Sequence, residues 1–168
     1  MQPKVSAIGA LIGVAFVLCG VGVFTPAWAV VSASSMGYSY SVSGGIVPWY
    51  SDEFVWASVG SWCMFISFGL YFPMALIYLH ASFKVNRHGC CHEIRHNFNG
   101  IALIASLITV LTAVAFTLFA INVPQSAYSQ YGNITESLGY SAYLSLASAI
   151  LTCIISFLAG HVARRDCH

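Results

Sequence analysis

The sequence predicts an all-α membrane protein, an up-down bundle of four transmembrane helices with a small β-sheet or hairpin in the first extracellular loop. The first observation behind this prediction is composition: 58% of the 168 residues are hydrophobic and only 7% are charged, whereas soluble domains carry about a quarter charged residues. The second is a set of long apolar segments, and the third is the distribution of the cations. This composition excludes a soluble or disordered protein. The net charge is only +1, so the chain lacks the excess of basic residues that would bind the phosphates of a nucleic acid.

The apolar segments define one tetraspan domain over residues 1–168. We expect helices at about residues 5–24, 54–80, 100–121 and 138–160. Each segment is long enough to cross about 30 Å of hydrocarbon, and none contains Asp, Glu, Lys or Arg. We expect outer loop 1 at about 25–53, an inner loop at about 81–99 and outer loop 2 at about 122–137. Connections this short make neighbouring helices antiparallel.

The cations predict the orientation of the bundle. All six lie on one side of a four-span arrangement: Lys4, Lys84, Arg87, Arg95, Arg164 and Arg165. The positive-inside rule makes that side cytoplasmic. We therefore expect a multi-pass membrane protein with both termini in the cytoplasm.

The first apolar segment has an alternative interpretation as a signal peptide. Ala27-Trp28-Ala29 would be its cleavage site. The apolar stretch is longer than the roughly 7–15 residues of a signal sequence, so we favour a first transmembrane helix.

Outer loop 1 has the pattern of a small sheet. Tyr38–Ser43 alternates with period two, and Gly44-Gly45 is a hairpin turn signal. Ile46-Val47 would begin the returning strand, and Ala29–Val31 would supply another. Four aromatic residues of this loop are the predicted extracellular interface: Trp28, Tyr38, Tyr40 and Trp49. The alternative is that the tyrosines only pack the loop against its own helices.

Small residues at helical spacing predict close helix packing, which membrane helices need because lipid is as apolar as leucine. Gly9 and Gly13 form a GxxxG step, and Ala105, Thr109 and Ala113 form a stripe. These residues pack inside the bundle or between two copies, and we favour packing inside.

One motif in the inner loop could carry chemistry. His92–His96 fits H-E-x-x-H, in which two histidines on a helix bind zinc and Glu93 acts as a general base. A membrane zinc protease is therefore a remote third function. The third ligand would have to be Asp166 in the tail, and Arg95 would place a cation beside the metal. We therefore expect no enzyme, no catalytic residue, no metal and no cofactor.

Two kinds of modification are predicted. Cys90, Cys91 and Cys167 are candidates for S-palmitoylation because they lie close to the cytoplasmic membrane edge, although free thiols are the alternative. Asn133 begins an Asn-Ile-Thr sequon in outer loop 2 and is a candidate for glycosylation.

The architecture resembles the claudin-like tetraspans: claudins, the peripheral myelin protein group and the accessory subunits of channels and receptors. Trp28 follows Thr25-Pro26-Ala27 at the end of the first helix, and Gly45–Trp49 is similar to the Gly-Leu-Trp part of the family signature. In its approximate match to this signature, the chain resembles divergent nematode claudin-like proteins more than vertebrate claudins. It has no cysteine between residues 20 and 62 for the loop-1 disulfide of the family.

The resemblance implies a non-enzymatic protein of the plasma membrane that acts through lateral and extracellular contacts in a cell–cell junction or in adhesion. The alternative is an accessory subunit that modulates the gating or trafficking of an ion channel or receptor. The implied partners are the lipid bilayer and either the protein itself or other membrane proteins. Arg165–His168 lacks an apolar last residue, so no PDZ scaffold is expected.

Overall fold

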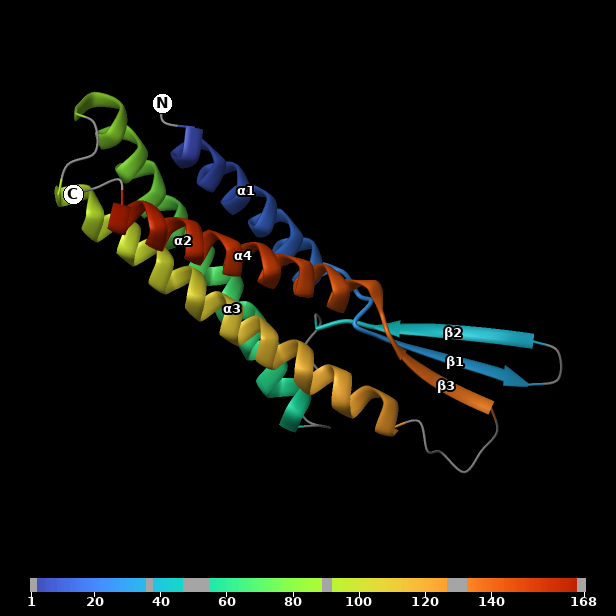
Figure 1. Cartoon of the computed structure of the whole chain (residues 1–168). Helices are drawn as coiled ribbons and strands as arrows, with labels where there is room; N and C mark the ends of the chain where they lie inside the picture. Colours follow the sequence, from blue (N-terminus) through green and yellow to red (C-terminus); the bar gives the residue numbers. More distant parts are fainter. Residues whose placement is uncertain (1–2, 36–37, 47–54, 89–91, 127–132, 166–168) are drawn as a thin grey trace.

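The computed structural model describes residues 3–35, 38–46, 55–88, 92–126 and 133–165. Four helices form the bundle: α1 (Pro3–Phe24), α2 (Val55–His88), α3 (His92–Ser126) and α4 (Tyr140–Arg165). All four are long and apolar enough to cross a membrane. Figure 1 shows them side by side, with the beginning of α1 and the end of α4 at the same end of the bundle. The predicted tetraspan bundle is confirmed.

The two central helices reach further than their expected spans. α2 continues to His88 and α3 begins at His92, so most of the expected inner loop at 81–99 is helical. Apolarity marks where a helix leaves the hydrocarbon and not where it ends. Lys, Arg and Glu are good helix formers in water, and the helix can continue through them.

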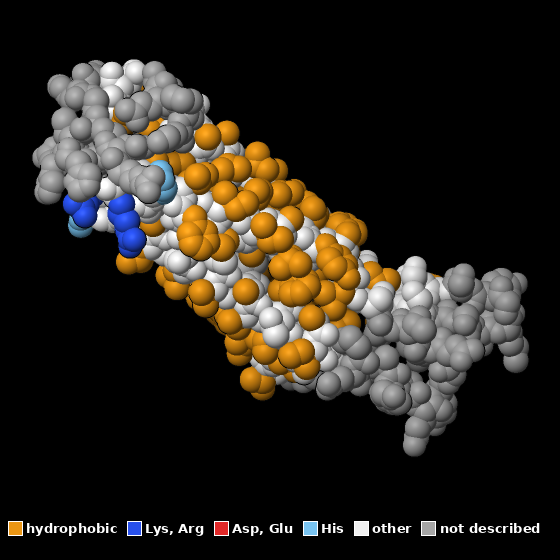
Figure 2. All heavy atoms as spheres, viewed as in Figure 1, with side chains coloured by type: hydrophobic (Ala, Val, Ile, Leu, Met, Phe, Trp, Pro, Cys, Tyr) orange, Lys and Arg blue, Asp and Glu red, His pale blue; other side chains and the backbone are white. Residues whose placement is uncertain are grey.

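The core lies along the helix faces that contact each other. On α1 the buried side chains recur every three or four residues: Val5, Ile8, Ile12, Ala15, Cys19 and Val23. The other face of α1 exposes Val14, Val17 and Val21. Figure 2 shows hydrophobic side chains covering much of one face of the bundle surface. An apolar core and an equally apolar surface are what a bilayer requires of a membrane bundle.

A three-stranded antiparallel sheet extends beyond the end of the bundle that lies opposite the chain termini (Figure 1). Its strands are β1 (Ala29–Ser35), β2 (Tyr38–Gly44) and β3 (Asn133–Leu138), in the order β2-β1-β3. The predicted sheet is confirmed, but β3 comes from outer loop 2 and was not predicted. We call this end the sheet end, and the opposite end, where α1 begins and α4 ends, the terminus end.

The predicted turn at Gly44-Gly45 is wrong. The register pairs Ser35 with Tyr38 and Ala29 with Gly44, so the chain reverses between β1 and β2 and Gly44 is the last residue of β2. Gly45 instead allows a close approach, because a Cβ there would lie 2.6 Å from the Cα of Pro26. Ile46 is buried and lies outside the strands, and Val47 falls outside the described residues.

Candidate interaction surface

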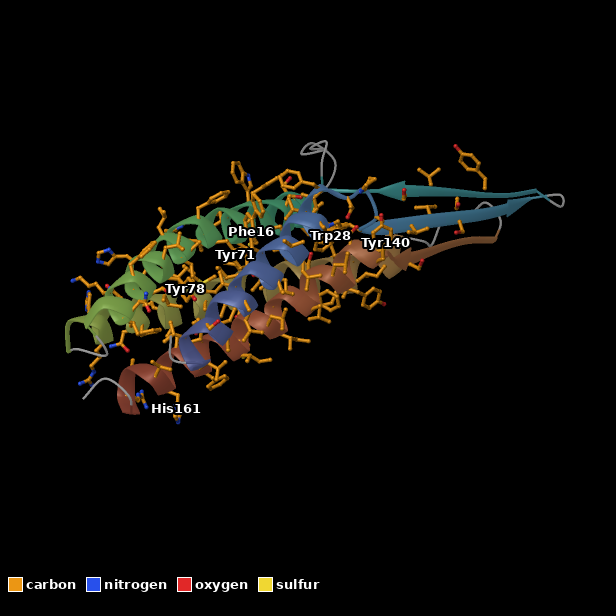
Figure 3. All side chains as sticks on the ribbon, turned by 90° about the horizontal axis from the view of Figure 1, so that it is seen from above. Phe16, Trp28, Tyr71, Tyr78, Tyr140 and His161 are labelled. Atoms are coloured by element: carbon orange, nitrogen blue, oxygen red, sulfur yellow. The ribbon has the colours of Figure 1, made fainter. Side chains whose placement is uncertain are left out.

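The sheet is joined to the bundle at Trp28. The Trp28 indole N–H donates to the carbonyl oxygen of Gly22 in α1 at 2.6 Å, and the ring lies 4.8 Å from the Phe119 ring of α3. The Trp28 backbone N–H donates to the carbonyl of Gly44 at 2.9 Å, and its carbonyl accepts from the N–H of Gly139 at 3.0 Å. One residue therefore connects two helices to the ends of β2 and β3. Figure 3 shows it at the point where the sheet leaves the bundle.

A second contact fixes the same joint from α4. The hydroxyl oxygens of Thr25 and Ser141 lie 2.7 Å apart, and the Ser141 N–H donates to the carbonyl of Ala27 at 3.1 Å. Gly139 leaves no room for a side chain, because a Cβ there would overlap the carbonyl group of Ala27. The segment between α1 and β1 and the start of α4 are therefore fixed to each other where the sheet joins the bundle.

Trp28 is an internal anchor and not a contact surface. Its side chain is only 1% exposed, so a partner cannot reach it in this conformation. The expectation of an extracellular interface at Trp28 is not supported. A tryptophan buried with its N–H bonded is instead typical of a packing role.

Among the described sheet residues, the exposed large hydrophobic side chains lie on β2. Tyr40 is 71% exposed and Val42 is 49% exposed, and both belong to the same face of the strand because they are two residues apart. Tyr38 occupies a matching position in β2, although only its backbone is described. Trp49 falls outside the described residues.

β2 is also an edge of the sheet. Among the described strands it pairs only with β1, and neither strand contains a charged residue. An uncharged edge with an exposed aromatic side chain is a surface to which another chain can bind.

The predicted helix-packing residues divide into two groups. Gly9 lies against the Tyr78 ring of α2, Ala105 is buried, and the Thr109 hydroxyl donates to that of Thr152 on α4 at 3.0 Å. Gly13 and Ala113 are exposed. Gly9, Ala105 and Thr109 therefore pack within one copy of the chain, as favoured from the sequence.

The H-E-x-x-H motif lies in the first turns of α3, which gives His92 and His96 the helical spacing that a zinc motif needs. His96 is exposed, whereas the side chains of His92 and Glu93 are outside the described set. Within the described residues, no group of three or more His, Cys, Asp or Glu side chains could hold a metal ion.

The predicted modification sites are only partly placed. Cys90, Cys91 and Cys167 lie outside the described residues. Asn133 is the first residue of β3, at the sheet end, and its backbone pairs with Ser34. Glycosylation and palmitoylation stay predictions.

The sequence interpretation missed β3 and its contribution to the joint. A weak signal was present, because Ile134 and Leu138 are apolar residues on one face of the strand, each next to polar residues. The segment is interrupted by Glu136 and is short, which is why it resembled a polar loop.

Four membrane-spanning helices with a small sheet built from both connections at one end define a claudin-like tetraspan. The model of the family described as "Tight junction protein, Claudin-like" matches residues 1–168, and the chain therefore belongs to this family. No curated protein matches the chain. The family assigns a tight-junction-type, multi-pass membrane protein, and its members are generally non-enzymatic.

Proposed function

We propose that the protein is a non-enzymatic component of cell–cell junctions or adhesion in the plasma membrane. It acts when the exposed face of β2 contacts a second copy or another membrane protein across the intercellular gap. The observation that carries this proposal is the exposure of Tyr40 and Val42 on an uncharged edge strand.

The chemistry of β2 fits a protein partner. A tyrosine buried at an interface contributes about 2 kcal/mol or more when it forms a hot spot. The outer edge of the strand can add backbone hydrogen bonds to a neighbouring strand. Apart from its two tyrosines and Val42, the strand consists of serine and glycine, which cost little to dehydrate compared with charged side chains.

The proposal places both termini in the cytoplasm and the sheet outside the cell. The described cations with placed side chains are Lys84 near the end of α2, Arg95 near the start of α3 and Arg164 near the end of α4. Blue side chains gather at this terminus end in Figure 2. The positive-inside rule supports a cytoplasmic position for it.

The test is a double substitution, Tyr40→Ser with Val42→Ser, in cells that otherwise lack the protein. We expect normal surface delivery but loss of cell aggregation, because neither side chain packs in the core. The matched control is Tyr140→Ser, which removes a 58% exposed tyrosine at the start of α4 and leaves β2 intact. Aggregation that survives the double substitution contradicts the proposal.

A second experiment separates adhesion from the accessory-subunit alternative. Blue-native electrophoresis of the solubilised protein, with mass spectrometry of each band, should show complexes of this chain alone or with other adhesion proteins. A channel or receptor present in fixed stoichiometry would favour the accessory role.

A further inference from the structure

A hollow with a partly polar lining, called the polar hollow below, lies between α3 and α4 at the terminus end. Its volume is about 670 Å³, and the residues that matter here are Asn99, Ser156, Gly160, His161 and Arg164. The Ser156 hydroxyl donates to the carbonyl of Ala102 at 3.0 Å and joins the two helices there. This bond holds α3 and α4 together beside the hollow, and the polar side chains that line the hollow come from both helices.

An apolar hollow of about 400 Å³ lies on the other side of the same helix, between α1 and α4. Ala7 and Ile8 line it from α1, and Leu158 and Val162 line it from α4. His161 belongs to the lining of both hollows. Figure 3 shows His161 near the end of α4, far from Trp28 and the sheet.

We propose that these hollows bind one anionic glycerophospholipid of the leaflet at the terminus end. Its phosphate lies in the polar hollow, where Arg164, His161 and Asn99 can donate hydrogen bonds to it. One acyl chain passes over the exposed Phe157 into the apolar hollow.

The occupant follows from position and charge. Both hollows border the surface of a membrane-spanning helix, so lipid is the molecule present there at the highest concentration. Among the described residues that line the polar hollow there is no Asp or Glu, whereas Arg164 carries a positive charge. Basic pockets between transmembrane helices near the membrane surface bind anionic headgroups. This site is separate from β2 and does not depend on the adhesion proposal.

The test is native mass spectrometry of the full chain in detergent, with phosphatidylserine or phosphatidylcholine of the same acyl chains added. We expect preferential retention of one phosphatidylserine. Arg164→Gln should weaken its binding about fivefold, the typical effect of one cation at a membrane surface, and should leave phosphatidylcholine unchanged. Arg95→Gln is the matched control, because it removes an arginine from the same end of the bundle but outside the hollow.

A second pair of variants tests the space and not the charge. A Cβ at Gly160 meets no other atom within 4 Å, so Gly160→Leu should fill the polar hollow and reduce phosphatidylserine binding without disturbing the helix. Gly69→Leu adds the same side chain to an equally open position on α2 and should have no effect. This pair decides the question if Arg164→Gln proves to be poorly folded in a thermal unfolding assay.

Two results would overturn the proposal. One is equal retention of the two lipids by the unsubstituted protein. The other is an equal loss of phosphatidylserine in Arg95→Gln and Arg164→Gln, which would indicate diffuse surface charge and no site.

Discussion

The phenol oxygen of Tyr71 on α2 lies 2.8 Å from the hydroxyl oxygen of Ser148 on α4, and both side chains are buried. The Ser148 hydroxyl also donates to the carbonyl of Ala15 on α1 at 2.9 Å. A serine hydroxyl has a single proton, so Tyr71 is the donor in the first bond. This pair joins three helices at one level of the bundle, and Tyr71 is labelled in Figure 3.

We expect Tyr71→Phe to destabilise the bundle by about 1 kcal/mol, which is typical of a side-chain hydrogen bond between membrane helices. The ring remains and only the bond to Ser148 is lost. The measurement is unfolding of the purified protein in mixed micelles of increasing SDS content. Tyr143→Phe removes a hydroxyl from a 58% exposed tyrosine on α4 and should leave the midpoint unchanged. An equal shift in both variants would contradict a specific role for the Tyr71 hydroxyl.

Buried and partly buried hydroxyls at other levels of the bundle have partners too. Thr109 donates to Thr152, and Thr112 lies 3.4 Å from Ser67. In the described part of the chain no buried side-chain nitrogen or oxygen lacks a hydrogen-bond partner. These bonds fix which helix faces meet, because apolar contacts alone discriminate poorly between core and lipid.

The GxxxG step gives a prediction with a built-in control. A Cβ at Gly9 would overlap the Tyr78 ring, whose hydroxyl donates to the Val5 carbonyl at 3.1 Å. Gly9→Ala should therefore displace Tyr78, break this bond and destabilise the bundle by about 1 kcal/mol. Gly13→Ala should be neutral because a Cβ there meets no atom within 4 Å. The SDS unfolding midpoint of the two variants is the measurement, and the opposite ranking would contradict the packing between α1 and α2.

The sequence predicted the helices well because the bilayer imposes a simple rule. A span such as residues 5–24 must be apolar throughout, and the structure places α1 at Pro3–Phe24. The helix ends outside the hydrocarbon follow no such rule. For this reason α2 continues through Lys84, where composition alone indicated a loop.

The sheet shows the limit of local patterns. Alternation in Tyr38–Ser43 identified β2, but strand pairing depends on contacts distant in sequence, such as Ala29 with Leu138. Glycine was misleading for a related reason. Gly45 serves the close approach to Pro26, and a single sequence does not distinguish this use from a turn.

The topology can be tested independently of function. Pro3 begins α1 and Arg165 ends α4 at the same end of the bundle, opposite the sheet. We expect tags added at residues 1 and 168 to resist protease in intact cells and to be digested after permeabilisation. Digestion of both tags in intact cells would reverse the proposed orientation, and digestion of the first tag alone would indicate signal cleavage.

The zinc motif gives a further prediction. Glu93→Gln should leave cell aggregation and surface level unchanged, because the proposed contact function needs no catalytic base. The companion measurement is the zinc content of the purified protein, with His92→Ala and His96→Ala as the control variant. Stoichiometric zinc that is lost in the control variant would contradict this prediction and support a metal site.

Trp28 gives the last prediction, because this single residue connects α1 and α3 through its side chain and the sheet through its backbone. Trp28→Phe keeps an aromatic ring but loses the hydrogen bond to the Gly22 carbonyl and part of the contact with Phe119. We expect a loss of about 2 kcal/mol from the missing bond, the orphaned carbonyl and the smaller ring. Limited proteolysis of the purified protein should then cut more rapidly within β1 and β2, while the helices stay protected. The control is Tyr140→Phe, a change to an exposed residue at the same end of the bundle. If Trp28→Phe and Tyr140→Phe are cut at the same rate, Trp28 does not hold the sheet on the bundle.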